Sequence, residues 1–154
     1  MCIRDRIEID LFADPNNSKV KKFFSRYKSP GSQGTDAFAQ DWSGLRAWVC
    51  PPTTKIVETV KKILQTKNMS GILVVPMWRS SSFWPFLCPD GIRITECFEK
   101  ATMFRPFLVH GDSMNPRKEF TLMKGFTKFP FVALYIGASG KKKLREGNVK
   151  MPKL

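Results

Sequence analysis

The sequence predicts an α/β domain in which helices pack on a layered sheet, and three observations lead to this fold class. Strand-like and helix-like segments alternate along the chain, a clear amphipathic helix lies between two strand patterns, and residues 71–75 form a fully apolar run typical of a strand buried on both faces. The 154 residues, 42% of them hydrophobic and 12% aromatic, are enough for one domain with a substantial core.

The first third of the chain alternates short strand patterns with turns. Residues 7–12 alternate and then become apolar, and the turn sequence Asp14-Pro15-Asn16-Asn17 follows, which predicts a strand and its end. Residues 29–34 are rich in Ser, Gly and Pro and predict a loop. Residues 46–50 predict another short strand, which Pro51 and Pro52 close.

The clearest helix is predicted over residues 56–64. Its apolar side chains fall at helical spacing on one face, whereas Lys62 and the other polar side chains are placed on the outer face. After the strand at 71–75, Ser80 to Ser82 mark a further helix start, which Pro85 limits to a turn or two. Two more strands are predicted over 103–109 and 131–136.

The charge balance indicates a polyanionic partner. The chain carries 26 Lys and Arg against 13 Asp and Glu, a formal net charge of +13. This excess favours nucleic acid first and an anionic membrane surface second. The sequence contains no run of about 18 apolar residues, which excludes a membrane-spanning helix. With no readable secretory signal, we expect a cytoplasmic or nuclear protein.

The cysteines do not favour a metal site. Cys2, Cys50, Cys88 and Cys97 lie far apart with no CxxC pair, so we expect reduced thiols and no structural zinc. Residues 1–6 alternate charge without a period and resemble a translated sequencing-adaptor scar. We expect them to be an artefact and the native chain to begin upstream, and we exclude them from the functional interpretation.

Two basic segments are candidate nucleic-acid contacts. Residues 19–28 contain no acid, and their aromatic side chains either stack on bases or form the core side of an amphipathic helix. The cations of this segment, which we expect to contact phosphate, are Lys19, Lys21, Lys22, Arg26 and Lys28. Residues 138–154 are predicted to be a basic C-terminal tail, either solvated or acting as an electrostatic arm or nuclear import signal. Its clustered cations are Lys141, Lys142, Lys143 and Arg145.

Three ordered segments resemble a known family. They are Asp10-Leu11-Phe12-Ala13, then Asp36-Ala37-Phe38 with Asp41-Trp42, then Cys50-Pro51-Pro52 followed by the helix and Val74-Val75-Pro76-x-Trp78. Together they resemble the phage-type DNA N6-adenine methyltransferases (Dam-like), in the form found in DIRS-type retroelement polyproteins after reverse transcriptase and RNase H. The similarity covers roughly residues 8–137. It implies a Rossmann-like methyltransferase sheet over residues 7–137, truncated or simplified at its start.

In the family, an Asn or Asp, two prolines and an aromatic residue hold the flipped adenine. The first side chain and the following proline carbonyl accept hydrogen bonds from the adenine amine, and the aromatic ring stacks on the base. Here the motif reads Cys50-Pro51-Pro52-Thr53. A thiol is a weak acceptor and Thr53 has no aromatic face. Since the loss of one preorganised hydrogen-bonding group costs about 10²–10³ in rate, we expect methyl transfer to be absent or residual.

The resemblance also implies a cofactor pocket for S-adenosylmethionine, lined by Asp10, Ala13 and Asp36, in which Asp10 accepts from the ribose or amino group. A Thr-Pro element that helps to build this pocket in the family is not found in this sequence. The alternative is that Asp10 and Asp14 only start and cap the turn that follows. Trp78 and Trp84 are likewise open to two interpretations, a position beside a substrate or one in the core.

The function expected from the sequence is a catalytically degenerate Dam-like module of a retroelement polyprotein, which binds nucleic acid or serves as structure. Its partners are then DNA or RNA and the neighbouring reverse transcriptase and RNase H, with no metal and no membrane. One alternative is an active DNA adenine methyltransferase that uses the variant Cys-Pro-Pro-Thr turn. Another is a basic nucleic-acid-binding domain without a cofactor.

Overall fold

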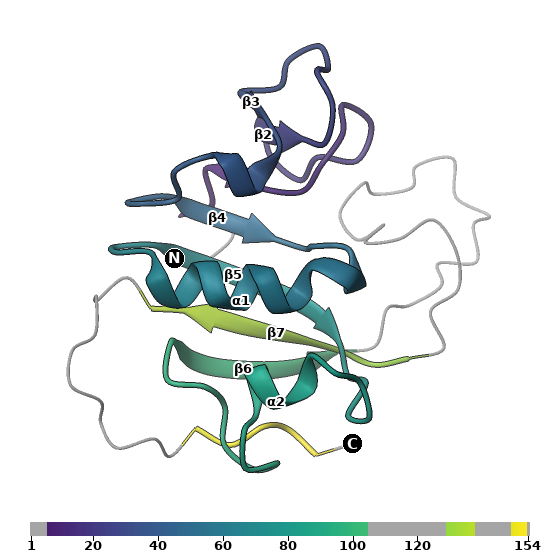
Figure 1. The fold of residues 1–154 in the computed structure, drawn as a ribbon, viewed down its shortest axis with the longest axis vertical. Helices are drawn as coiled ribbons and strands as arrows, with labels where there is room; N and C mark the ends of the chain where they lie inside the picture. Colours follow the sequence, from purple (N-terminus) through teal and green to yellow (C-terminus); the bar gives the residue numbers. More distant parts are fainter. Residues whose placement is uncertain (1–5, 105–128, 138–148, 154) are drawn as a thin grey trace.

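The computed structural model describes residues 6–104, 129–137 and 149–153, and within them seven strands form one mixed sheet (Figure 1). The strand order is β3-β2-β1-β4-β5-β7-β6. The bounds are β1 Ile9–Asp10, β2 Lys22–Ser25, β3 Gly34–Thr35, β4 Arg46–Val49, β5 Ser70–Pro76, β6 Phe98–Phe104 and β7 Phe131–Ile136. The strands from β3 to β5 pair in parallel, and β7 runs antiparallel between β5 and β6. The expectation of an α/β domain is confirmed.

The helices of the described chain lie on one face of the sheet, in front of it in Figure 1. Helix α1 (Ile56–Gln65) connects β4 to β5 and buries Ile56, Val60 and Ile63, close to the bounds that the apolar spacing predicts. Helix α2 (Trp84–Leu87) is one turn long with Pro85 inside it, also as predicted. Between the sheet and α1 lies the main core, which includes the fully buried Leu73.

The inner strands bury side chains on both faces. Along β5, Leu73 and Val75 belong to the main core, whereas Ile72 and Val74 belong to a second cluster with Phe131 on the opposite face. Because side chains alternate along a strand, an apolar run without polar gaps fits a strand with two covered faces. The prediction for residues 71–75 is therefore confirmed.

The amphipathic helix considered for residues 19–28 is wrong, because the structure has strand β2 there. Phe23 and Phe24 are adjacent and both buried, which an extended chain permits because successive side chains point to opposite faces. Tyr27, which the helix would have buried, is 69% exposed. Phe23 and Phe24 in β2 are therefore core residues, whereas Tyr27 is not.

Two boundaries near the C-terminus differ from expectation. Strand β6 begins at Phe98, five residues before the predicted start, and residues 105–109 lie outside the described chain. Residues 149–153, expected in a solvated tail, lie against the domain: Met151 is buried, its N–H donates to the Ile92 carbonyl, and the Val149 carbonyl accepts from Ile94. Lys141, Lys142, Lys143 and Arg145 lie outside the described residues.

Candidate functional site

The strand order reverses between β1 and β4, and this point collects residues from distant parts of the sequence. From β1 the chain continues toward β2 and β3, whereas from β4 it continues toward β5. In open α/β sheets, ligands bind outside the carboxyl ends of the strands at such a reversal. Here β1 ends at Asp10, which pairs with Trp48, and β4 ends at Val49. The fold therefore brings Asp10 close to the segment that starts at Cys50.

The Asp10 carboxylate holds the connection that follows its own strand. One oxygen accepts the Phe12 N–H at 3.2 Å and the other accepts the Lys19 N–H at 3.0 Å. Asp10 is only 2% exposed, and this burial raises the pKa of its carboxyl while the two backbone hydrogen bonds lower it. Both oxygens thus have a donor from the chain itself.

The same connection is stabilised at its tip by a second aspartate. The Asp14 carboxylate accepts the N–H groups of Asn16 at 2.7 Å and Asn17 at 3.0 Å, and the Asn17 side chain accepts the Asp14 N–H at 2.8 Å. These contacts match the interpretation in which Asp10 and Asp14 order a turn. The connection over residues 11–21 contains no glycine and no helix.

The other residues that the resemblance assigns to the cofactor also have contacts within the chain. The Ala13 N–H donates to the Phe24 carbonyl at 3.1 Å. Asp36 follows β3 and caps the 3-10 turn η2 (Ala37–Ala39) by accepting the Phe38 N–H at 3.1 Å. Cofactor sites of this sheet type use a glycine-rich turn and a helix N-terminus after the first strand. The residues present after β1 do not fit S-adenosylmethionine in that way.

The Cys50-Pro51-Pro52-Thr53 segment links β4 to α1. Pro51 is buried, and the Pro52 carbonyl accepts the Lys55 N–H at 2.8 Å, which begins the 3-10 turn η3 (Thr53–Lys55) before α1. Cys50 packs partly buried against the second apolar cluster. Burial first, and then the nearby charge of Asp10, raises the pKa of the Cys50 thiol to about 11. At neutral pH this thiol is protonated, which opposes a role as a nucleophile.

The raised pKa of Cys50 predicts a pH dependence of stability. The thiol pKa is about 11 in the folded chain and 9.0 in the reference state, so the folded state holds the proton more tightly. Its contribution is complete below pH 9 and is lost as the pH rises through 11, by up to about 3 kcal/mol. We expect Cys50→Ala to lose less stability than the parent between these pH values in urea unfolding. Equal losses in both proteins would contradict the burial of this thiol.

An aromatic cluster joins the first two segments of the resemblance. Phe12, Phe38 and Trp42 lie with ring centroids 5.5 to 6.3 Å apart, and the Trp42 indole N–H donates to the Ala37 carbonyl at 2.8 Å. Trp42 is fully buried. Aromatic pairs at these separations stabilise a fold beyond the area that they bury. These residues therefore have a structural role on the α1 side of the sheet.

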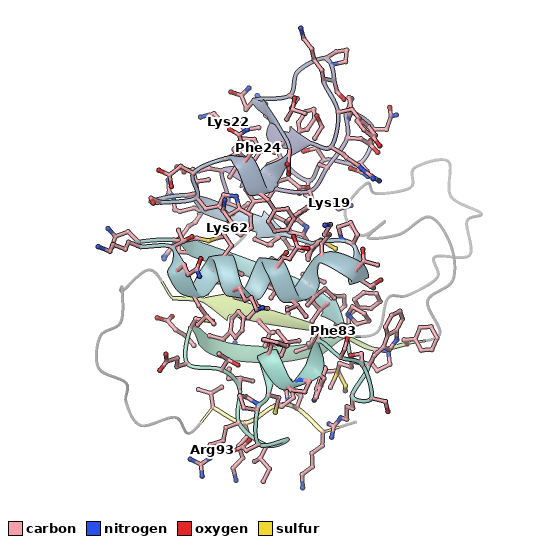
Figure 2. The ribbon with its side chains drawn as sticks, viewed as in Figure 1. Lys19, Lys22, Phe24, Lys62, Phe83 and Arg93 are labelled. Carbon is pink, nitrogen blue, oxygen red and sulfur yellow. The ribbon has the colours of Figure 1, made fainter. Side chains whose placement is uncertain are left out.

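Lys62 on α1 contacts this aromatic cluster and the backbone beside it. The sequence did not predict these contacts. Its ammonium group donates to the Phe38 carbonyl at 2.6 Å and the Gln40 carbonyl at 2.7 Å, and lies 4.9 Å from the Trp42 ring centroid. Figure 2 shows this side chain between α1 and the preceding segment. The helical pattern places Lys62 on the outer face and gives no signal for these two acceptors.

The predicted cations of residues 19–28 do not form one stripe. Lys21, Lys22, Arg26 and Lys28 are exposed, whereas Lys19 is half-buried beside Asp10. Lys19 and Lys22 lie well apart in Figure 2. The Arg26 guanidinium lies 5.3 Å from the exposed Tyr27 ring centroid. The four exposed cations are accessible to a polyanion. Lys19 instead lies beside Asp10, where the strand order reverses.

The part of the chain that the structure describes was also searched for a metal site, a membrane-spanning helix and a surface pocket at the predicted site residues. No group of three or more His, Cys, Asp or Glu that could hold a metal is found among the described residues. In the same ranges, no helix has the length and apolar character needed to cross a bilayer. A shallow surface depression lies along the outer side of α1 and contains none of the predicted site residues; it is lined by Asp41, Ser43, Glu58, Lys61, Lys62, Gln65 and Thr66.

Comparisons with known proteins give no relative for this fold or site. A scan against models of protein families, a search of curated proteins and a search of solved structures each found no match.

Proposed function

We propose that this chain is a Rossmann-like, Dam-like domain that binds nucleic acid without transferring a methyl group, and that it belongs to a retroelement polyprotein with reverse transcriptase and RNase H. The parallel strands in the order 3-2-1-4-5 support the Rossmann-like assignment, because the classic doubly wound sheet shares that order. The ordered resemblance supports the polyprotein context.

The observation that carries the proposed loss of catalysis is the hydrogen bonding of Asp10. At the strand-reversal point, where a cofactor is expected in this sheet type, both carboxylate oxygens bind backbone N–H groups of the chain's own connection. The adjoining turn presents a neutral thiol and a threonine in place of an amide or carboxylate and a ring. The adenine half of the transfer reaction therefore lacks its usual groups, and in the cofactor half Asp10 already holds the chain's own connection.

The charge supports a nucleic-acid partner. The chain has a net charge of +13, and Lys21, Lys22, Arg26 and Lys28 are exposed within β2 or within three residues of its ends. Cations that neutralise phosphates release condensed counterions, so the logarithm of the affinity falls linearly with the logarithm of salt concentration. Each phosphate contact contributes about −0.9 to this slope for duplex DNA and about −0.7 for a single strand.

The salt dependence of binding tests this function. We expect fluorescence anisotropy with labelled DNA and RNA to give a steep negative slope, which becomes shallower when Lys21, Lys22, Arg26 and Lys28 are all replaced by alanine. Lys67→Ala, an exposed lysine outside β2, serves as a control that changes the slope by no more than about one contact. A slope of log affinity against log salt concentration near zero for the parent chain would contradict the proposal.

A further inference from the structure

Two exposed aromatic side chains meet where β5 ends and β7 begins. Trp78 follows β5 and is 37% exposed, and Phe129 precedes β7 and is 48% exposed. Their ring centroids lie 5.5 Å apart with the planes nearly perpendicular, at 89°. Because β5 and β7 are antiparallel, with Pro76 opposite Phe131, segments far apart in the sequence meet here. We call Trp78 and Phe129 the aromatic step.

The aromatic step is held in place by its surroundings. The Met77 N–H donates to the Pro130 carbonyl at 2.9 Å, which ties the two segments together. The Trp78 carbonyl accepts the N–H of Ser81 at 3.0 Å and its hydroxyl at 2.5 Å. The buried Phe83, labelled in Figure 2, supports Trp78 with a centroid distance of 6.5 Å. Exposed rings that are already ordered lose little conformational entropy when a ligand binds.

The position and charge of the step favour a nucleic-acid strand. It lies at the sheet edge formed by the carboxyl ends of the parallel strands, where such sheets bind their ligands. The next residue is the exposed Arg79, whose guanidinium lies 6.0 Å from the Trp84 ring centroid and donates one N–H to the Pro152 carbonyl. In a chain of net charge +13, rings next to a cation match the bases and phosphates of a polyanion.

An unpaired base fits this arrangement better than a base pair. A duplex hides the flat faces of its bases, whereas a single strand offers them for stacking on aromatic side chains. We propose that the aromatic step binds an unpaired base of single-stranded DNA or RNA, which stacks on Trp78 against Phe129 while Arg79 faces the adjoining phosphate. This inference rests on the proposed nucleic-acid binding and adds selectivity for single strands.

Anisotropy titration of the full chain with a short labelled single strand, and with the same strand in a duplex, tests the inference. Trp78→Ala and Phe129→Ala are compared with the parent. Since one stacked base contributes about 1–3 kcal/mol, we expect Trp78→Ala to weaken single-strand binding about 5- to 150-fold. Duplex affinity and the salt slope should stay at the parent values, because no phosphate contact is removed. Ile92→Ala, which truncates an apolar side chain that is 56% exposed in the turn before β6, should change neither.

The outcomes separate this inference from the proposed function. A parent chain without salt-dependent binding overturns both. A parent that binds, with Trp78→Ala leaving single-strand affinity unchanged or weakening single strand and duplex equally, overturns only the aromatic step. Concentration-dependent dimers that Trp78→Ala abolishes, with unchanged single-strand affinity, would assign the surface to a second copy and also overturn it.

A second pair of variants keeps the test decisive if Trp78→Ala does not fold. Trp78→Tyr retains an aromatic ring, and Trp78→Leu retains apolar bulk without one. We expect the tyrosine variant to keep most of the single-strand affinity and the leucine variant to lose it. Equal affinities for the two folded variants would contradict stacking.

Discussion

Gly71→Ala is expected to lower the free energy of unfolding by about 4 kcal/mol, at the upper end of single-substitution effects. Gly71 in β5 has a φ of +143°, and an added Cβ would lie 1.9 Å from the carbonyl oxygen of Ala47, its pairing partner in β4. The atom in the way belongs to the backbone, so β4 and β5 must separate to admit a methyl group. Denaturant unfolding of parent and variant measures the loss.

Gly44→Ala is the matched control for this prediction. Gly44 also has a positive φ, +71°, but an added Cβ there meets no atom within 4 Å. Only backbone strain remains, at a cost of about 1–2 kcal/mol. Similar losses for the two variants would exclude the steric contact as the cause. A Gly71→Ala protein as stable as the parent would contradict the pairing register of β4 and β5.

Lys62→Met is expected to lower the free energy of unfolding by about 2–3 kcal/mol. The substitution keeps an apolar chain of similar length but removes the ammonium group, which leaves the carbonyls of Phe38 and Gln40 without this donor. Hydrogen bonds that involve a charged group contribute about 1.5–3 kcal/mol, and the contact with Trp42 adds to them. Urea unfolding measures this loss as well.

Lys61→Met is the control, because it changes the neighbouring helical position to the same residue. Lys61 is exposed and its ammonium lies 5.5 Å from the Phe86 ring centroid, a surface contact that we expect to contribute about 0.5–1 kcal/mol. If both variants lose the same stability, Lys62 does not anchor the Phe38–Gln40 segment. A larger loss for Lys62→Met alone supports the anchoring role.

The elements that the sequence predicted best are those whose own residues show a clear apolar periodicity or an apolar run. The apolar stripe from Ile56 to Leu64 fixes α1 within one residue, and the run from 131 to 136 matches β7. Strand β2 was missed within residues 19–28, because a short segment with two adjacent phenylalanines fits a helix as well as a strand. Pairing with β1 and β3 decides in favour of the strand, and these partners are not visible from the segment itself.

The candidate site was predictable as a set of residues but not in its contacts. The resemblance singles out Asp10 and Cys50, and the fold brings them close together at the strand reversal. The Asp10 oxygens bind the N–H groups of Phe12 and Lys19 because the connection over residues 11–21 folds back onto β1. The spacing of residues in the sequence does not predict this fold. The contacts of Lys62 span more than 20 residues of sequence and were missed for the same reason.

Methyl transfer tests the central claim most directly. Radiolabelled S-adenosylmethionine is incubated with adenine-containing DNA and either the parent chain or the double variant Cys50→Asn, Thr53→Tyr, which restores the family's motif. We expect background incorporation from both proteins, because Asp10 is already bonded to the chain's own connection and its neighbours do not fit the cofactor. Robust incorporation by the parent, or by the double variant alone, would contradict the proposed loss of the cofactor site.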